Sequence, residues 1–352
     1  MDLVTVLVPT YNRPGALVKA ILSIQAQTYK NLKIIVSDNA GSDKTPGIMR
    51  EIAAGDSRIS YIRHEHTLPR IDHFLFLFDQ VKTPYFALLC DDDLLLPNFL
   101  EDALLGFSKH PEILYSALFT VAVNEDHELV STDEKFKLES GYYTVEQAVR
   151  YFVIENYVHH GTPATLYSKK TIKLIHDNRS LCTGPYFCDM FFSFILMSSG
   201  PIYFSSKPGG IFFFNDTSQS VTSDVSLIYP NWIDKLTDLY QLVARYNGLK
   251  ASVCSRLERI YNKRLFANGV RALLEKDIDK YNNVTFAFNS MYGRLKYSYI
   301  LKGLKTIEYI FPGTVETLFK IKSFYKKYLL RKKSDNKKRD LVEQDVSAFL
   351  KL

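Results

Sequence analysis

Apolar runs that stop at turns alternate with helix-like segments through roughly the first 110 residues of the chain. Runs typical of buried strands cover residues 3–9, 32–38, 59–64 and 85–90. Between them, and again after the fourth, apolar residues recur at helical spacing. Strands and helices alternating about every 25 to 30 residues imply βαβ units with right-handed crossovers. We therefore expect an α/β fold with a mostly parallel sheet flanked by helices.

Polar clusters follow three of these expected strands. The segment Pro9–Arg13 follows the first strand, residues 37–43 follow the second, and Asp91–Asp93 follow the fourth. Ligands of open α/β sheets bind beyond the carboxyl ends of the strands. The three clusters are therefore expected to converge at one edge of the sheet and to form a binding site there.

The triplet Asp91–Asp93 lies between two apolar runs, where unpaired carboxylates are costly. A hard divalent cation, Mg²⁺ or Mn²⁺, binds carboxylate and phosphate oxygens and neutralises a diphosphate as it leaves. The triplet therefore favours a metal and phosphate site. The residues alone leave an alternative open, in which the triplet is a solvated loop or caps the helix that begins near Pro97.

Three segments together resemble glycosyltransferase family 2 on a GT-A fold. They are "VTVLVPTYNRP", "LKIIVSDNAGSDKT" and "PYFALLCDDDLLLPNFLE", which occur in the family's order and spacing. The resemblance covers about residues 3–222. It implies an inverting, metal-dependent transfer from a nucleotide-sugar donor (UDP-, GDP- or dTDP-sugar) to a glycan or lipid-linked oligosaccharide acceptor, as in bacterial-type surface polysaccharide synthesis. The implied cofactor is a divalent cation, Mn²⁺ or Mg²⁺.

The resemblance also implies roles for single residues around the donor. Tyr11 would pack against the nucleotide base, Asp38 would hydrogen-bond the base, and Asp91 would face the ribose. All the residues that we expect to bind the donor belong to the polar clusters or to the segment before the third expected helix: Pro9, Thr10, Tyr11, Arg13, Asp38, Arg70 and Asp91.

The implied metal ligands are Asp92 and Asp93. Many family members have an aspartate where Cys90 stands, so the sequence departs from the family pattern at that position. Arg70 and His73 could reach the diphosphate, because a guanidinium fork suits phosphate oxygens. The alternative for both is a surface loop with solvated charges.

Inversion needs a carboxylate that deprotonates the acceptor hydroxyl as it attacks. In the resembled family this base lies at the start of a helix well beyond the metal motif. Asp189 fits, as the lone acid in "GPYFCDMFFSFILMSSG", and burial would raise its pKa toward a useful range. The alternative is a helix N-cap. Near the acceptor side lie His159 and His160, although paired histidines are most often ordinary loop residues, and Asn215 stands where the family usually has a histidine.

The pattern changes after about residue 113, and the chain is expected to become wholly helical beyond Pro230. We expect a GT-A-like domain over 1–225, with a nucleotide-sugar-binding half (1–112) and an acceptor-binding half (113–225), followed by a helical region over 226–352. In the second half the expected strands cover 113–123, 164–168, 201–206 and 210–214, and the expected helices cover 143–155 and about 188–197.

The C-terminal segment is strongly basic. Between Lys320 and Arg339, Asp335 is the only acidic residue, and "TVETLFKIKSFYKKYLLRKK" gathers apolar side chains on one helical face. A basic amphipathic helix is a candidate for binding an anionic membrane surface, and a helix packed on its own domain is the alternative. Flotation with anionic and neutral vesicles separates the two. No recognisable module suggests nucleic-acid binding.

Several sequence patterns that the chain lacks bear on its expected location and on the competing functions. The chain shows no signal-peptide pattern, no apolar run long enough for a bilayer and no CxxC spacing, so we expect a cytoplasmic protein, peripheral on the inner face of the cell membrane. A sugar nucleotidyltransferase would need a glycine-rich loop after the first strand, and "PTYNRPG" lacks that glycine density. A third possibility is a catalytically inactive module of the same fold that binds glycan or lipid.

Overall fold

The computed structural model describes residues 2–41, 44–123, 129–131, 139–154, 163–182 and 188–213, and parts of 251–310. The chain divides into two compact units, one formed mainly by residues 1–218 and the other mainly by residues 251–348. The two units are considered separately below. The predicted boundary near residue 225 lies outside the described residues and stays a prediction.

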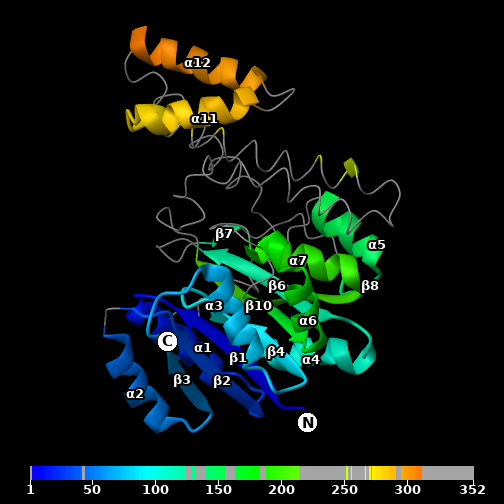
Figure 1. The fold of residues 1–352 in the computed structure, drawn as a ribbon. Coiled ribbons are helices and arrows are strands. Elements are labelled where there is room, and N and C mark those ends of the chain that lie inside the picture. Colours follow the sequence, from blue (N-terminus) through cyan, green and yellow to red (C-terminus); the bar gives the residue numbers. More distant parts are fainter. Residues whose placement is uncertain are drawn as a thin grey trace. The chain divides into compact units, whose positions relative to one another are not determined.

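The larger unit alternates strands and helices as the sequence pattern predicts (Figure 1). Its first half contains β1 (Val4–Thr10), α1 (Pro14–Gln25), β2 (Leu32–Asp38), α2 (Thr45–Gly55), β3 (Ile59–Arg63), α3 (Arg70–Asp79), β4 (Tyr85–Leu88), β5 (Leu94–Leu95) and α4 (Phe99–Lys109). Its second half contains β6 (Tyr115–Val123), β7 (Leu129–Ser131), β8 (Gly141–Tyr143), α5 (Val145–Ala148), a π-helical turn (Val149–Ile154), β9 (Thr165–Ser168), α6 (Lys170–Asp177), a 3₁₀ turn (Arg179–Cys182), α7 (Cys188–Ser199) and β10 (Ile202–Phe213).

The strands form one sheet in the order β3-β2-β1-β4-β9-β6-β10-β5, with β7 on β6 and β8 on β10. The first four strands of this order are parallel, as the alternation predicts. β9 then runs antiparallel between β4 and β6, while β6 and β10 are parallel. The predicted fold class is confirmed, and the antiparallel strands are confined to the second half of the sheet.

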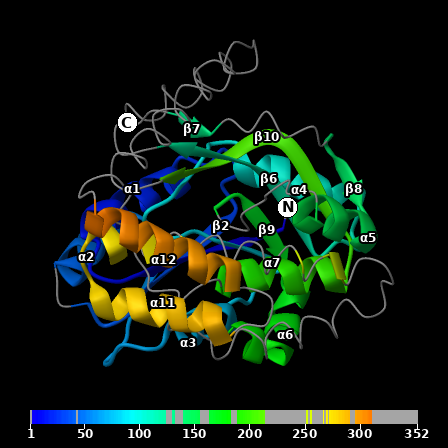
Figure 2. The ribbon, with the colours of Figure 1, turned by 90° about the horizontal axis from the view of Figure 1, so that it is seen from above.

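Helices cover both faces of this sheet because its central strands are apolar on both sides. On one face, Val4, Val6 and Val8 of β1 share a core cluster with residues of α1, α2 and α4. On the other face, Phe86 of β4 lies 5.5 Å, between ring centroids, from Phe78 of α3. Seen from above, α1 and α4 lie on one side of the sheet, and α3 and α6 on the other (Figure 2).

Local signals explain where the helices near the strand ends begin. Pro14 occupies the first turn of α1, where its missing N–H costs nothing. The first turn of α4 carries Glu101 and Asp102, and its last turn carries Lys109, which complements the helix dipole at both ends. α1 therefore starts directly after the first polar cluster, whereas α4 follows the triplet only after the short strand β5.

The prediction of two strands over 201–206 and 210–214 is wrong. One strand, β10, runs through both segments, with register shifts against β6 on either side of Pro208. A proline lacks the N–H for a sheet hydrogen bond, and a bulge accommodates it without ending the strand. The predicted helix over 143–155 is also more complex, since a four-residue α-helix passes into the π-helical turn at Val149.

The described part of the smaller unit is helical, with α11 (Ile278–Ser290) and α12 (Leu295–Ile310). Val284 and Leu301 are fully buried there, and a Cβ at Gly269 would lie 2.7 Å from the Leu301 side chain. Within the described residues, no helix is both long and apolar enough to cross a bilayer. The basic segment 314–333, with its predicted membrane surface, lies outside the described residues.

Candidate active site

The carboxyl ends of β1, β2 and β4 meet at one place, as predicted. The Thr10 hydroxyl at the end of β1 donates to Asp91 Oδ2 at 2.7 Å, although the two residues lie far apart in sequence. The backbone N–H of Asn39, just after β2, donates to the carbonyl oxygen of Thr10 at 3.0 Å. All three clusters therefore share one edge of the sheet.

The turn between β1 and α1 directs Arg13 at the aspartate triplet. Asn12 has a left-handed backbone (φ 55°), which asparagine tolerates better than most residues, and Pro14 begins the helix. From this turn, Arg13 Nη1 lies 2.6 Å from Asp92 Oδ2 and 3.4 Å from Asp91 Oδ1. The Tyr11 side chain in the same turn is half exposed and accessible to a ligand.

Asp91 is one of two buried members of the triplet, and it is the one that contacts β1. Its burial raises the pKa of its carboxyl group from 3.8 to about 6. Neighbouring Asp92 also raises this pKa, whereas the Thr10 hydrogen bond, the Arg13 charge and the Tyr11 backbone N–H lower it. Asp91 thus depends on its partners to carry a charge at this depth.

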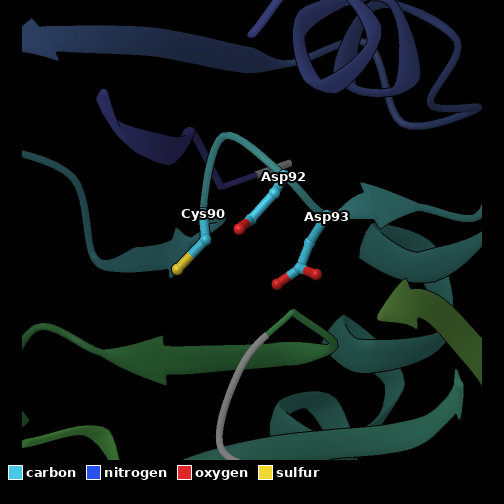
Figure 3. Close-up of side chains that lie close together, drawn as sticks. All are labelled: Cys90, Asp92 and Asp93. Atoms are coloured by element: carbon cyan, nitrogen blue, oxygen red, sulfur yellow. The ribbon is translucent and has the colours of Figure 1, made fainter. Parts of the chain in front are cut away.

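Cys90, Asp92 and Asp93 present their side chains on the same side of the loop after β4 (Figure 3). One ligand atom from each lies within 4.8 Å of the others. Asp93 is buried, its N–H donates to the Cys90 carbonyl at 3.1 Å, and its Oδ1 accepts a 3.4 Å hydrogen bond from the N–H of Phe213. The two carboxylates are the oxygen donors that Mg²⁺ and Mn²⁺ take, so the donor set fits such a cation, with Cys90 as a softer neighbour.

Asp38 lies at the end of β2 with its carboxylate completely buried. Its Oδ1 accepts a 2.9 Å hydrogen bond from the Gly41 N–H, and its Oδ2 accepts one of 2.7 Å from the Tyr61 hydroxyl. Arg63 adds an ion pair at 3.8 Å. A Cβ at Gly41 would lie 2.8 Å from the Asn12 side chain, so the turns after β1 and β2 approach closely. These contacts shape the turn, and a contact between Asp38 and a nucleotide base stays a prediction.

Asn39 is a supporting residue that the sequence reasoning missed. Its side chain donates to the carbonyl of Leu68 at 3.0 Å and accepts from the N–H of Leu68 at 2.8 Å. This pair of bonds ties the segment before α3 to the end of β2. Arg70, the first residue of α3, is exposed next to that segment. An asparagine directly after an apolar run typical of a strand was the signal in the sequence.

His73 does not face solvent as a phosphate ligand would. The side chain is buried, and its Nε2 lies 2.9 Å from the Ser37 hydroxyl, which is also 3.0 Å from Nε2 of His64. The two imidazole rings meet edge to face at 5.3 Å. His73 therefore packs against β2 through its contact with Ser37.

This burial predicts a pH-dependent stability. Burial, followed by the neighbouring His64, lowers the pKa of His73 from 6.5 to about 4. The unfolded chain therefore takes up the proton first, and stability is lost as pH falls from about 6.5 toward 4. Between pH 7 and pH 5 we expect the free energy of unfolding to fall by about 2 kcal/mol more in the unmodified protein than in His73→Gln. Urea titrations at both pH values measure this difference, and equal losses in the two proteins would contradict it.

Other predicted site residues are only partly described. Asp189 is the second residue of α7, at the start of a helix as predicted, but its side chain is outside the described part of the structure. His159, His160 and Asn215 also lie outside the described residues. The role of Asp189 as a base stays a prediction.

Comparison with known proteins bears on this site directly. The sequence model of "Glycosyl transferase family 2" matches residues 5–168, which include all three polar clusters. Residues 5–168 are therefore similar to glycosyl transferase family 2. The matched segment runs from β1 to the last residue of β9.

Two curated relatives carry glycosyltransferase names. The chain is 39% identical over 102 residues to the GalNAc(5)-diNAcBac-PP-undecaprenol beta-1,3-glucosyltransferase of Campylobacter jejuni, covering 28% of this chain and 33% of that protein. It is 29% identical over 187 residues to an uncharacterized glycosyltransferase of Methanocaldococcus jannaschii, covering 52% of this chain and 62% of that protein. The chain thus spans between a third and about three-fifths of the length of these relatives.

The fold extends beyond the family match. Residues 1–349 of Staphylococcus aureus TarS, solved in complex with UDP-GlcNAc, superpose with a TM-score of 0.59 at 16% identity, over 82% of this chain and 80% of that one. The same TarS fragment without that ligand gives a TM-score of 0.54. The likeness shows a shared GT-A fold.

Proposed function

We propose that this protein is an inverting glycosyltransferase that moves a sugar from a nucleotide sugar to a glycan or lipid-linked saccharide with the help of a divalent cation. The observation that carries the proposal is the meeting of Thr10, Arg13 and the triplet Asp91–Asp93 at one sheet edge inside a family 2 domain. The names of the relatives support transfer of a glycosyl group, and the undecaprenol-linked substrate of the Campylobacter enzyme supports a lipid-linked acceptor.

The described residues suit a donor that has an aromatic base at one end and a negatively charged diphosphate at the other. Tyr11 offers an exposed ring on which a base can stack. Arg70, exposed at the start of α3, offers a guanidinium that suits phosphate oxygens. The TarS fragment has been solved with UDP and with UDP-GlcNAc, which supports a uridine nucleotide among the candidate donors.

Asp92 and Asp93 are the residues that would hold the cation. When bound, a divalent ion of this kind neutralises the negative charge that develops on a leaving diphosphate. Arg13 partly offsets the charge of the triplet, and Thr10 and the Tyr11 backbone hold Asp91 in place. In this proposal Asp189 accepts the proton of the acceptor hydroxyl.

A nucleotide-sugar panel tests the function. UDP-, GDP- and dTDP-sugars, each with and without Mn²⁺, are compared by the shift in melting temperature, since a ligand that binds only the folded protein must raise it. We expect one class of donor to stabilise the protein, and to do so only with the cation. No shift with any donor, or equal shifts with and without Mn²⁺, would contradict the donor or the metal assignment respectively.

Two alternatives predict different products. A sugar nucleotidyltransferase would form a nucleotide sugar and pyrophosphate from a sugar phosphate and a nucleoside triphosphate. An inactive binding module would leave bound nucleotide sugar intact, whereas a glycosyltransferase slowly hydrolyses its donor in the presence of Mn²⁺. Chromatography of the nucleotide products after long incubation separates all three outcomes.

A further inference from the structure

We propose that Arg13 is an internal counter-ion of the aspartate triplet, which competes with the divalent cation for Asp92 and thereby sets the affinity of the metal site. This inference rests on the proposed function, because it concerns the same carboxylates. It assigns Arg13 to the control of metal affinity, in addition to any contact with the donor.

Arg13 and a bound cation would both contact the carboxylate of Asp92. Nη1 of Arg13 lies 2.6 Å from Asp92 Oδ2, a short charge-assisted distance. The Asp92 carboxylate also belongs to the cluster in which ligand atoms of Cys90, Asp92 and Asp93 lie within 4.8 Å of one another. A cation that binds Asp92 must therefore share the carboxylate with the guanidinium or displace it.

The backbone holds Arg13 in a position to compete. The residue stands between Asn12, whose backbone is left-handed, and Pro14, which begins α1. The side chain is about half exposed, with 42% of its surface accessible, so it is neither locked in the core nor free in solvent. The guanidinium keeps its charge at every working pH.

Charge explains why the exchange matters. The three carboxylates of the triplet and one guanidinium leave two net negative charges when all are ionised, which one divalent cation neutralises. Without Arg13 the triplet attracts a metal ion more strongly. When Arg13 is removed, the site also lacks one positive charge that attracts the donor diphosphate, so the affinity for the donor falls. Opposite effects on metal and on donor are the signature of this role.

The experiment measures Mn²⁺ binding by calorimetry without any donor. We expect Arg13→Gln to bind Mn²⁺ about three- to fivefold more tightly than the unmodified protein, and to bind the donor about three- to fivefold more weakly at saturating Mn²⁺. Arg13→Met, a second neutral variant, should repeat both changes. Arg13→Lys, which keeps the charge, should stay close to the unmodified protein.

Arg58→Gln is the matched control, because Arg58 makes its ion pair with Asp56 and not with the triplet. An unchanged or weaker Mn²⁺ affinity in both neutral variants would overturn the role of Arg13 and leave the proposed function standing. If Arg58→Gln raised the Mn²⁺ affinity equally, the change would be an effect of net charge alone, and the role of Arg13 would again be overturned. If the unmodified protein binds donor but no Mn²⁺, the metal assignment fails and the inference fails with it.

Discussion

Asp92→Ala is expected to abolish the divalent-dependent part of donor binding, with a loss of affinity of about 100-fold or more. The reason is that Asp92 offers the exposed carboxylate of the proposed metal cluster and lies in contact with Arg13. Removing a metal ligand costs a large share of the metal's affinity, and with it the ion that would neutralise the donor diphosphate. Calorimetric titration with the best donor of the panel, with and without Mn²⁺, measures the effect.

The matched control for this variant is Asp177→Ala. Asp177 also pairs with a cation, since its carboxylate lies 2.6 Å from Nζ of Lys173, but the pair lies on the exposed face of α6. Its loss should leave donor binding within about twofold, because exposed ion pairs contribute little. Undiminished Mn²⁺-dependent donor binding in Asp92→Ala would exclude Asp92 as a metal ligand.

Asp189→Asn is expected to keep donor binding within about twofold and to lower the rate of sugar transfer by about 10²- to 10⁴-fold, the usual contribution of a general base. Asparagine cannot accept the acceptor's proton in the same way, yet it has nearly the size and shape of aspartate. As the second residue of α7, Asp189 lies inside the helix and not at its N-cap, so the substitution tests the base with little disturbance of the helix start. Release of nucleoside diphosphate with a lipid-linked or glycan acceptor measures the rate.

Two further comparisons complete this test. Asp189→Ala should match Asp189→Asn in transfer, because both remove the base. Transfer within about tenfold of the unmodified rate in Asp189→Asn would place the base elsewhere.

The sequence predicted the donor-side architecture well because each signal there is local. Buried apolar runs ending in polar residues placed β1, β2 and β4 to within a residue or two, and the parallel order of strands brought their carboxyl ends together. The meeting of Thr10 with Asp91 follows from that order. The fold class and the edge on which the site lies were therefore predictable without coordinates.

Other features depend on long-range pairing that a local pattern does not contain. β5 is two residues long and exists because Leu94 and Leu95 pair with β10. β10 itself was predicted as two strands, since residues 207–210 have the composition of a turn. In the structure, these residues continue the strand because they pair with β6. The contact between Arg13 and Asp92 depends on side-chain direction, and no spacing rule predicts it.

The short strand after the triplet has a consequence for the energetics of the proposed cation site. The loop that carries Asp91–Asp93 is fastened at one end by β4 to β1 and at the other by β5 to β10, and the Leu96 N–H adds a 2.9 Å bond to the Gly209 carbonyl. A loop held at both ends has already lost much of its conformational entropy during folding. Binding of the proposed cation would therefore require little further ordering of the loop.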